Sequence, residues 1–250
     1  MPLTPWVLRL LVANIALYLL QLVTPLAFDL GALVPVELPY RPWTIVTYMF
    51  LHAGTTHILW NMVALYFFGP RLEDRMGGRA FIVLYLVAGI AGGLLSFLTP
   101  YSRIVGASGA IFGVTVGYAY YWPRDTIYFW GILPVQAWIL VLIFAGFDLL
   151  GGMGGPGDQV AHFAHLGGAV GGFATIKIFE WTSRGRRFRA KARPAPKRVD
   201  LEKWRRIRRE SLHEVNRAEY DRIMEKLEER GAGSLTSDER LFLDNFSDRA

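Results

Sequence analysis

Residues 80–102 read AFIVLYLVAGIAGGLLSFLTPYS, a run of 23 residues without a charged side chain. An uncharged, mainly apolar run of about 18 residues or more is typical of a helix that crosses the roughly 30 Å hydrocarbon core of a bilayer. Core helices of soluble domains seldom reach this length without a charge. The run therefore predicts a transmembrane helix.

The same pattern recurs through the first 182 residues. These residues contain only 8 Lys and Arg and 8 Asp and Glu, which separate one apolar run from the next. The first run is long and lacks a clear small-residue cleavage site, so we interpret it as a membrane helix and not as a removable signal peptide. We expect six spans, within the uncharged runs 10–28, 42–70, 80–102, 104–123, 126–147 and 159–176.

The rest of the composition excludes several classes of protein. The 250 residues include no cysteine, which excludes a disulfide scaffold, and 52% of them are hydrophobic, which excludes a disordered chain. The net charge of +6 lies entirely after residue 182, where 19 basic residues face 13 acidic ones. We therefore predict an all-α membrane bundle at 1–182, a basic proline-containing linker at 183–199 and a charged helical tail at 200–250.

Basic residues in short loops predict which way the bundle faces. With six spans both termini lie on one side, and placing them in the cytoplasm leaves only Arg41 and Arg103 in the outer loops. The second, fourth and sixth spans then all begin near the outer surface. The inner segments contain the basic tail together with Arg9, Arg71, Arg75, Arg79 and Arg124.

Two loops have distinctive compositions. Residues 25–47 contain four prolines with Trp43 and Tyr40, which predicts an irregular segment held at the outer interface by aromatic rings. Residues 151–158, GGMGGPGD, offer almost no side chains to pack, and we expect them to form a lid or hinge over an outer cavity.

The tail has its own helical pattern. Charged residues alternate with apolar ones over 200–230, which predicts a helix that ends at residues 231–233, GAG. Thr236 and Glu239 form a capping-box pattern that opens a last short helix. The basic residues favour contact with anionic lipid, and because acidic residues interleave with them we expect no nucleic acid as a partner.

Gly106-Ala107-Ser108-Gly109 marks the expected start of the fourth span. A hydroxyl there is accessible, and the unpaired N–H groups of a helix start can stabilise a developing oxyanion. The alternative is purely structural, because Gly109, Gly113 and Gly117 continue a ladder of small residues that close helix packing alone would explain.

His165, Gly168 and Gly172 share one stripe of the sixth span at positions i, i+3 and i+7. The glycines allow another helix to come close, and the fourth span with its own glycines is the expected neighbour. This packing brings His165 to Ser108 as a general base. His162 is the rival base, but it lies nearer the surface and off the glycine stripe.

The second span contributes polar side chains on one face. His57 and Asn61 are four residues apart and offer the N–H donors that an oxyanion needs. The alternative is that they bond only to neighbouring helices or to water. His52, just before this pair, is expected to anchor the preceding turn and not to take part in catalysis.

No acidic residue is expected near Ser108 or His165 within the spans. Asp148 and Asp158 instead flank the glycine-rich loop. The hypothesis from the sequence is therefore a Ser–His dyad in which packing orients the base.

At this point the chain resembles the rhomboid family of intramembrane serine proteases, over approximately residues 5–181. The resemblance covers the expected helices in their expected order. It depends on four motifs: HAGTTHILWN at 52–61, EDRMG at 73–77, GASG at 106–109, and AHLGG at 164–168.

The resemblance implies Ser108 as the nucleophile and His165 as general base and then acid. It also implies an oxyanion hole formed by His57, Asn61 and the Ser108 N–H. It implies no cofactor and no metal.

The resemblance implies supporting roles as well. Glu73 and Arg75 match the Glu-x-Arg motif that stabilises the inner loop. Phe112 stands at a position that can be Tyr and stacks on the catalytic histidine, so the stack is kept and the hydroxyl is lost. Gly168 and Gly172 provide the close packing.

The implied function is hydrolysis of peptide bonds in or near the transmembrane helices of membrane-protein substrates. The expected location is a prokaryotic plasma membrane, with the active site open to the exterior. One alternative is an inactive rhomboid-like protein that binds and escorts membrane clients. Another is a metal site or transporter built from His52, His57, His162 and His165, although these fall in two pairs without the spacing of a zinc motif.

Overall fold

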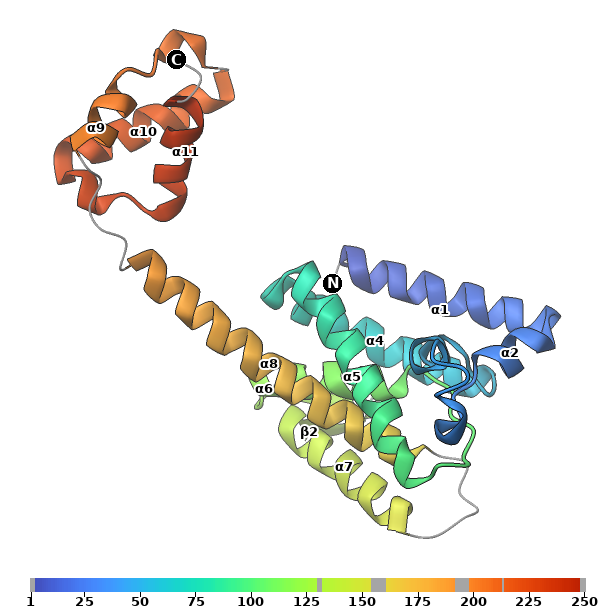
Figure 1. Ribbon diagram of the computed structural model, residues 1–250. Helices are drawn as coiled ribbons and strands as arrows, with labels where there is room; N and C mark the ends of the chain where they lie inside the picture. The colour runs from blue at the N-terminus through green and yellow to red at the C-terminus, as the bar shows by residue number, and fades with distance from the viewer. Residues whose placement is uncertain (1–2, 130–131, 154–160, 192–197, 213, 248–250) are drawn as a thin grey trace. The chain divides into compact units, whose positions relative to one another are not determined.

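The computed structural model describes residues 3–129, 132–153, 161–191, 198–212 and 214–247 (Figure 1). The chain divides into two compact units, Met1–Trp181 and Thr182–Ala250. Most described residues are helical, which confirms the predicted helical class.

The first unit is a helical bundle (Figure 1). Its short helices are α2 (Pro25–Gly31), α3 (Thr44–Thr47), η1 (Pro35–Glu37), η2 (Tyr48–Phe50) and η3 (Ser96–Leu98). Its long helices are α1 (Pro5–Val23), α4 (Thr55–Met76), α5 (Gly78–Leu95), α6 (Ser108–Tyr121), α7 (Ala137–Met153) and α8 (His162–Lys191), the last of which continues beyond residue 181.

Two of the described helical segments are long and apolar enough to cross a membrane by length and hydropathy, Pro5–Val23 and Gly78–Leu98. The apolar helix α7 is shorter, with 17 residues. The count of six spans therefore stays a prediction.

The start of α1 is fixed by the end of α4. The Glu73 carboxylate accepts the backbone N–H groups of Trp6 and Val7 at 3.0 Å each, and the Thr4 hydroxyl also donates to it. The first N–H groups of a helix lack partners within the helix, so a buried carboxylate at that point satisfies them and complements the helix dipole. Arg75 lies over the Tyr121 ring, 4.9 Å from its centroid. Glu73 and Arg75 therefore make structural contacts at the C-terminal end of α4, whereas His57 lies at its N-terminal end.

The predicted fifth span, 126–147, is wrong in its first half. Strands β1 (Thr126–Phe129) and β2 (Leu133–Gln136) form an antiparallel hairpin there, and the helix begins only at Ala137. The hairpin residues are mainly β-branched and aromatic, and Pro134 removes one helical N–H donor, so the local preference is for strands. The helix that follows runs on to Met153.

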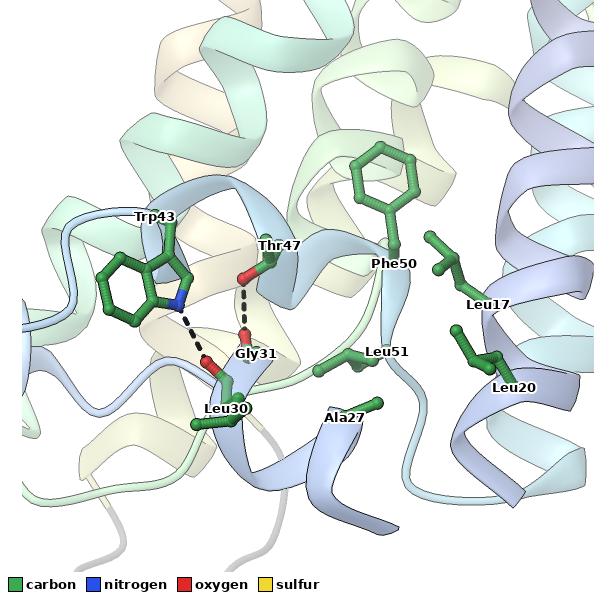
Figure 2. Close-up of a pocket in the computed structure, with 9 residues that line it drawn as sticks. All are labelled: Leu17, Leu20, Ala27, Leu30, Gly31, Trp43, Thr47, Phe50 and Leu51. Atoms are coloured by element: carbon green, nitrogen blue, oxygen red, sulfur yellow. Dashed lines mark hydrogen bonds between the residues drawn. The ribbon is translucent and has the colours of Figure 1, made fainter. Parts of the chain in front are cut away.

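The second predicted run, 42–70, also differs from a single helix. Helix α4 starts only at Thr55. The preceding residues 25–50 form no element longer than the seven residues of α2. Trp43 Nε1 donates to Leu30 O at 3.0 Å, and Thr47 Oγ1 donates to Gly31 O at 2.8 Å (Figure 2). An open apolar pocket lies beside these bonds, lined by Leu17, Leu20, Ala27, Leu30, Gly31, Trp43, Thr47, Phe50 and Leu51 (Figure 2).

The predicted lid at 151–158 is described only in part. Residues 151–153 are the last residues of α7 and are therefore helical, whereas 154–158 lie outside the described residues. The hinge function remains a prediction.

The second unit contains α9 (Arg198–Arg205), α10 (Glu214–Arg230) and α11 (Ser237–Ser247), with η4 (Arg209–Ser211) and η5 (Ala232–Ser234) between them. The predicted single helix over 200–230 is wrong, because the chain leaves the helix after Arg205. The break allows residues on both sides of it to share one core. That core comprises Trp204, Ile207, Leu212, Tyr220, Ile223, Leu227, Leu235 and Leu243.

The boundaries around this unit are partly as expected. Helix α8 extends to Lys191, so residues 183–191 of the predicted linker are helical, while 192–197 lie outside the described residues. Helix α10 ends at Arg230, and the following Gly231 has a φ of +71°, a conformation that favours glycine. The predicted stop at residues 231–233 is confirmed.

The capping box of α11 is also confirmed. The Thr236 N–H donates to Glu239 Oε2 at 2.7 Å, and the Glu239 N–H donates to Thr236 Oγ1 at 3.2 Å. Lys226 of α10 adds its ammonium to the same carboxylate at 2.9 Å, which ties α10 to α11. Burial by itself raises the pKa of Glu239, but the Thr236 N–H and Lys226 outweigh it and lower this pKa to about 2.

We predict that Glu239→Gln loosens α11 in the full-length chain. At neutral pH the opening free energy from hydrogen–deuterium exchange should fall by about 1–3 kcal/mol, because a buried charge-assisted network is lost. The carboxylate pKa is depressed on folding, so its stabilisation is complete above the ordinary glutamate pKa and disappears as the pH falls towards 2. The difference between wild type and variant should therefore vanish at low pH. Glu229→Gln, at a side chain 60% exposed, is the control, and equal protection of both variants at neutral pH contradicts the prediction.

Candidate active site

Ser108 and His165 meet where α6 and α8 begin. Ser108 is the first residue of α6, and His165 lies in the first turns of α8. His165 Nε2 is 2.8 Å from Ser108 Oγ, which is hydrogen-bond distance for a hydroxyl and an imidazole nitrogen. Both side chains are partly buried, and that of His165 is 14% exposed.

Glycines bring these two helices together. A Cβ added to Gly168 would lie 1.9 Å from Gly109 O, and one added to Gly172 would lie 2.4 Å from the Cα of Gly113. Real Cβ atoms do not approach backbone this closely, so α6 and α8 touch backbone to backbone along this stripe. Gly168 is one helical turn from His165, and Gly109 directly follows Ser108. The contact therefore sets the distance between the hydroxyl and the imidazole.

The other nitrogen of His165 contacts Asp148, an acidic residue expected at the edge of the glycine-rich loop. Asp148 Oδ1 of α7 is 2.9 Å from His165 Nδ1, and the Asp148 side chain is only 7% exposed. The expectation that no carboxylate lies near His165 is wrong. Asp148 does not flank a loop but sits inside α7, five residues before its end at Met153.

The physical reason is the register of two antiparallel helices. Helices α7 and α8 run side by side in opposite directions, so residues shortly before the end of α7 lie level with the first turns of α8 (Figure 1). Phe144 and Asp148 are four residues apart and therefore share the face of α7 that meets His165. Asp148 is the one charged residue of α7, an otherwise apolar helix, and this is the feature of the sequence that could have indicated the contact.

His162 also lies at this carboxylate. Its Nδ1 is 2.8 Å from Asp148 Oδ1, the same oxygen that contacts His165. Of the two candidate bases, His165 is the one placed at hydrogen-bond distance from the Ser108 hydroxyl.

An aromatic ring covers the face of the His165 imidazole. The Phe112 ring is stacked on it with 4.6 Å between centroids and 8° between planes. Phe144 of α7 packs against Phe112 in turn, at 6.0 Å. Phe112 has no hydroxyl, so this stack restrains the imidazole by packing alone.

His57 faces the loop that precedes Ser108. Gly106 has a φ of +124°, and a Cβ there would lie 2.7 Å from His57 Nε2 and 3.5 Å from Ser108 Oγ. The Ala53 N–H donates to His57 Nδ1 at 3.4 Å. Because Nδ1 accepts, the neutral ring carries its proton on Nε2, the atom that faces the Gly106–Ser108 turn. This arrangement can supply one oxyanion donor.

The Asn61 side chain bonds within its own helix. Its Nδ2 donates to His57 O at 2.9 Å, within its own helix. One of the two amide protons is therefore used to hold the first turns of α4 together. The second amide N–H is the one that could donate a hydrogen bond to an oxyanion, and Asn61 is 6% exposed.

His52 is fully buried beside His57. The ring centroids lie 5.1 Å apart in an edge-to-face arrangement. The Gln21 side chain of α1 bonds both backbone polar groups of His52. The His52 N–H donates to Gln21 Oε1 at 3.0 Å, and Gln21 Nε2 donates to His52 O. Among the residues that the structure describes, neither ring nitrogen of His52 has a hydrogen-bond partner. These contacts give His52 an anchoring role in the turn.

The alternative of a metal site finds no support in this arrangement. Within the described ranges, no group of three or more His, Cys, Asp or Glu side chains has the placement to hold a metal ion. His52 and His57 pack against each other, while His162 and His165 converge on Asp148.

Comparison with known proteins identifies the family that the chain matches. Residues 39–181 match the family described as the Rhomboid domain. The chain is 37% identical over 136 residues to RHOMBOID-like protein 2 of Arabidopsis thaliana, covering 54% of this chain and 41% of that protein. It is 33% identical over 132 residues to the Rhomboid protease GluP of Bacillus subtilis, covering 52% and 25%.

A third relative is matched over a longer stretch. The chain is 31% identical over 179 residues to Rhomboid-like protease 3 of Toxoplasma gondii, covering 66% of this chain and 65% of that protein. The match thus spans between a quarter and about two thirds of the length of these three relatives.

We predict that Gly168→Ala separates α6 from α8. The new methyl group would lie 1.9 Å from Gly109 O, so one helix must shift. The hydrogen bond between Ser108 and His165 must then lengthen. We expect at least a tenfold slower reaction of Ser108 with a fluorophosphonate, with a lower melting temperature, each measured on purified protein in detergent. Gly146→Ala in α7, where a Cβ meets nothing within 4 Å, is the matched control. Equal labelling of the two variants contradicts the prediction.

Proposed function

Since the chain belongs to the rhomboid family, we propose that it is an intramembrane serine endopeptidase that cleaves membrane proteins in or near their transmembrane helices. The observation that carries this proposal is the 2.8 Å distance between Ser108 Oγ and His165 Nε2. A hydroxyl becomes an effective nucleophile when a base stands within hydrogen-bond reach, and this pair meets that requirement.

The proposed membrane arrangement has six spans formed by α1 and α4–α8, with both termini in the cytoplasm. Many of their outward side chains are large and apolar, for example Leu22, Phe67, Leu142 and Val170, each more than half exposed, as expected of surfaces that face lipid. Under this orientation the first residues of α4, α6 and α8 lie near the outer surface, and so does the site that they build.

The proposed first step is an attack by Ser108 Oγ on the carbonyl carbon of the scissile peptide. His165 Nε2 accepts the hydroxyl proton as the new bond forms, and it then donates that proton to the departing amine. An acyl group remains on Ser108. Water activated by the same nitrogen hydrolyses this ester and restores the free serine.

The proposed oxyanion hole lies at the start of α6. The Ser108 N–H belongs to the first turn of that helix, whose N–H groups have no carbonyl one turn earlier to bond. His57 Nε2 faces the same turn, and the second amide proton of Asn61 completes the set. Donors already aimed at the oxygen stabilise the tetrahedral intermediate without reorganising.

The proposed substrates are proteins with a transmembrane helix. A helix uses its carbonyls in internal hydrogen bonds, so the cleaved segment must unwind before its carbonyl reaches Ser108. We therefore propose a preference for small and helix-destabilising residues around the cut.

We predict that Ser108→Ala abolishes hydrolysis of single-span substrates by the full-length protein in detergent. The loss should be about 10³-fold or more, because covalent catalysis is removed, and His165→Gln should lose a similar factor. Product bands and their mass spectra give the measurement. Ser96→Ala is the matched control, since the Ser96 hydroxyl donates to Gly92 O in the same helical segment.

Fluorophosphonate labelling separates this proposal from a binding and escort function. Labelling of Ser108 that depends on His165 is expected of a protease. Full cleavage by Ser108→Ala, or a wild type that binds single-span proteins without labelling or cutting them, would overturn the proposed activity.

A further inference from the structure

We propose that Asp148 is a positioning residue that holds the His165 imidazole in the tautomer required for accepting the Ser108 proton, with His162 fixing the carboxylate in turn. This inference rests on the proposed protease function. It replaces the two-residue dyad by a chain of contacts from α7 through α8 to α6: Asp148 Oδ1, His165 Nδ1, His165 Nε2 and Ser108 Oγ.

The tautomer follows from the two distances at the imidazole. A carboxylate oxygen accepts hydrogen bonds, so at 2.9 Å from Asp148 Oδ1 it is His165 Nδ1 that carries the proton. A neutral imidazole has one N–H, so Nε2 then has a lone pair. That lone pair is directed at Ser108 Oγ, 2.8 Å away. In the other tautomer Nε2 would donate to the hydroxyl and could not take its proton.

The location of Asp148 argues against a purely incidental contact. It is the one acidic residue in α7, an otherwise apolar helix, and its side chain is 7% exposed. A carboxylate buried in such surroundings is costly unless it is hydrogen-bonded, and polar groups inside membrane segments are usually functional. Among the described residues, the two partners at Asp148 Oδ1 are both imidazoles of α8, and one of them belongs to the proposed base His165.

The carboxylate also matches the charge that develops during the reaction. When His165 accepts the serine proton it becomes an imidazolium, and its positive charge then lies beside Asp148. The attraction is stronger in the partly buried site than in water, so it favours the transition state over the resting state. This effect acts on turnover and not on substrate binding.

His162 has a defined part in this arrangement. Its Nδ1 is 2.8 Å from the oxygen that contacts His165, so the carboxylate is held from two positions one helical turn apart. Gly151 of α7 makes room for this ring, because a Cβ there would lie 2.3 Å from His162 Nε2. His162 thus orients Asp148 and is not an alternative base.

A merely structural bond between α7 and α8 is the competing explanation. Both explanations predict lower stability when Asp148 is removed, but only the positioning role predicts a selective loss of kcat with an isosteric variant. The readouts are therefore kcat and KM, measured separately from the melting temperature.

The experiment uses full-length protein in detergent micelles with a single-span substrate. For Asp148→Asn we expect kcat to fall about 100-fold or more, because the amide neither fixes the tautomer nor stabilises the imidazolium, with KM within about twofold of wild type. His162→Gln should lose about tenfold in kcat, in the range typical of outer-shell partners. Asp125→Asn is the control, because Asp125 is another hydrogen-bonded acid of the first unit, 35% exposed and paired with Arg71 and Tyr118 away from Ser108. It should keep the wild-type kcat.

A second measurement does not depend on the folding of any Asp148 variant. Nitrogen-15 NMR of histidine-labelled wild type, assigned by the loss of one signal in His165→Gln, should show His165 protonated at Nδ1 and bare at Nε2. An Nε2-protonated ring overturns the inference, and so does an Asp148→Asn enzyme with kcat within threefold of wild type. If wild type and Ser108→Ala both fail to cleave any substrate, the proposed function fails instead, while the NMR result still decides the tautomer.

Discussion

The close approach of α6 and α8 is the constraint on which the rest of the site depends. Gly168 and Gly172 lie directly against the backbone of Gly109 and Gly113. Because no side chains separate them, the two helices pack closely and have little freedom to slide. Ser108 and His165 are each within one helical turn of this contact. The rigid packing of the two helices therefore fixes the distance between the Ser108 hydroxyl and the His165 imidazole.

Once that distance is fixed, the His165 ring is restrained on three sides. Phe112 from α6 covers its face, Ser108 meets one nitrogen, and Asp148 from α7 meets the other. Each restraint removes a different motion, since stacking limits tilting and the two polar contacts limit rotation about χ2. A ring held in this way loses little entropy when a proton moves, which is how preorganised sites lower a barrier.

The sequence predicted the Ser108–His165 pair better than the carboxylate behind it, for a physical reason. Glycine ladders repeat with the helical period and identify which faces touch, so the pairing of α6 with α8 could be inferred from residues alone. The position of Asp148 depends on where α7 begins. The hairpin at 126–136 delays that start to Ala137, and the helix then continues past Asp148 to Met153. A helix ending at residue 147 would have left this carboxylate in a loop, and apolar runs do not distinguish the two cases.

Three side chains of the proposed site share one further property, which is that they stand near helix starts. His57 is the third residue of α4, Ser108 the first of α6 and His165 the fourth of α8. The N-terminal turn of a helix carries partial positive charge and unpaired N–H groups, so negative charge that develops on a substrate oxygen near Ser108 is stabilised by the backbone as well as by side chains. The same field favours the Asp148 carboxylate at the first turn of α8. In the proposed mechanism, helix starts thus stabilise both the oxyanion beside Ser108 and the buried Asp148 carboxylate.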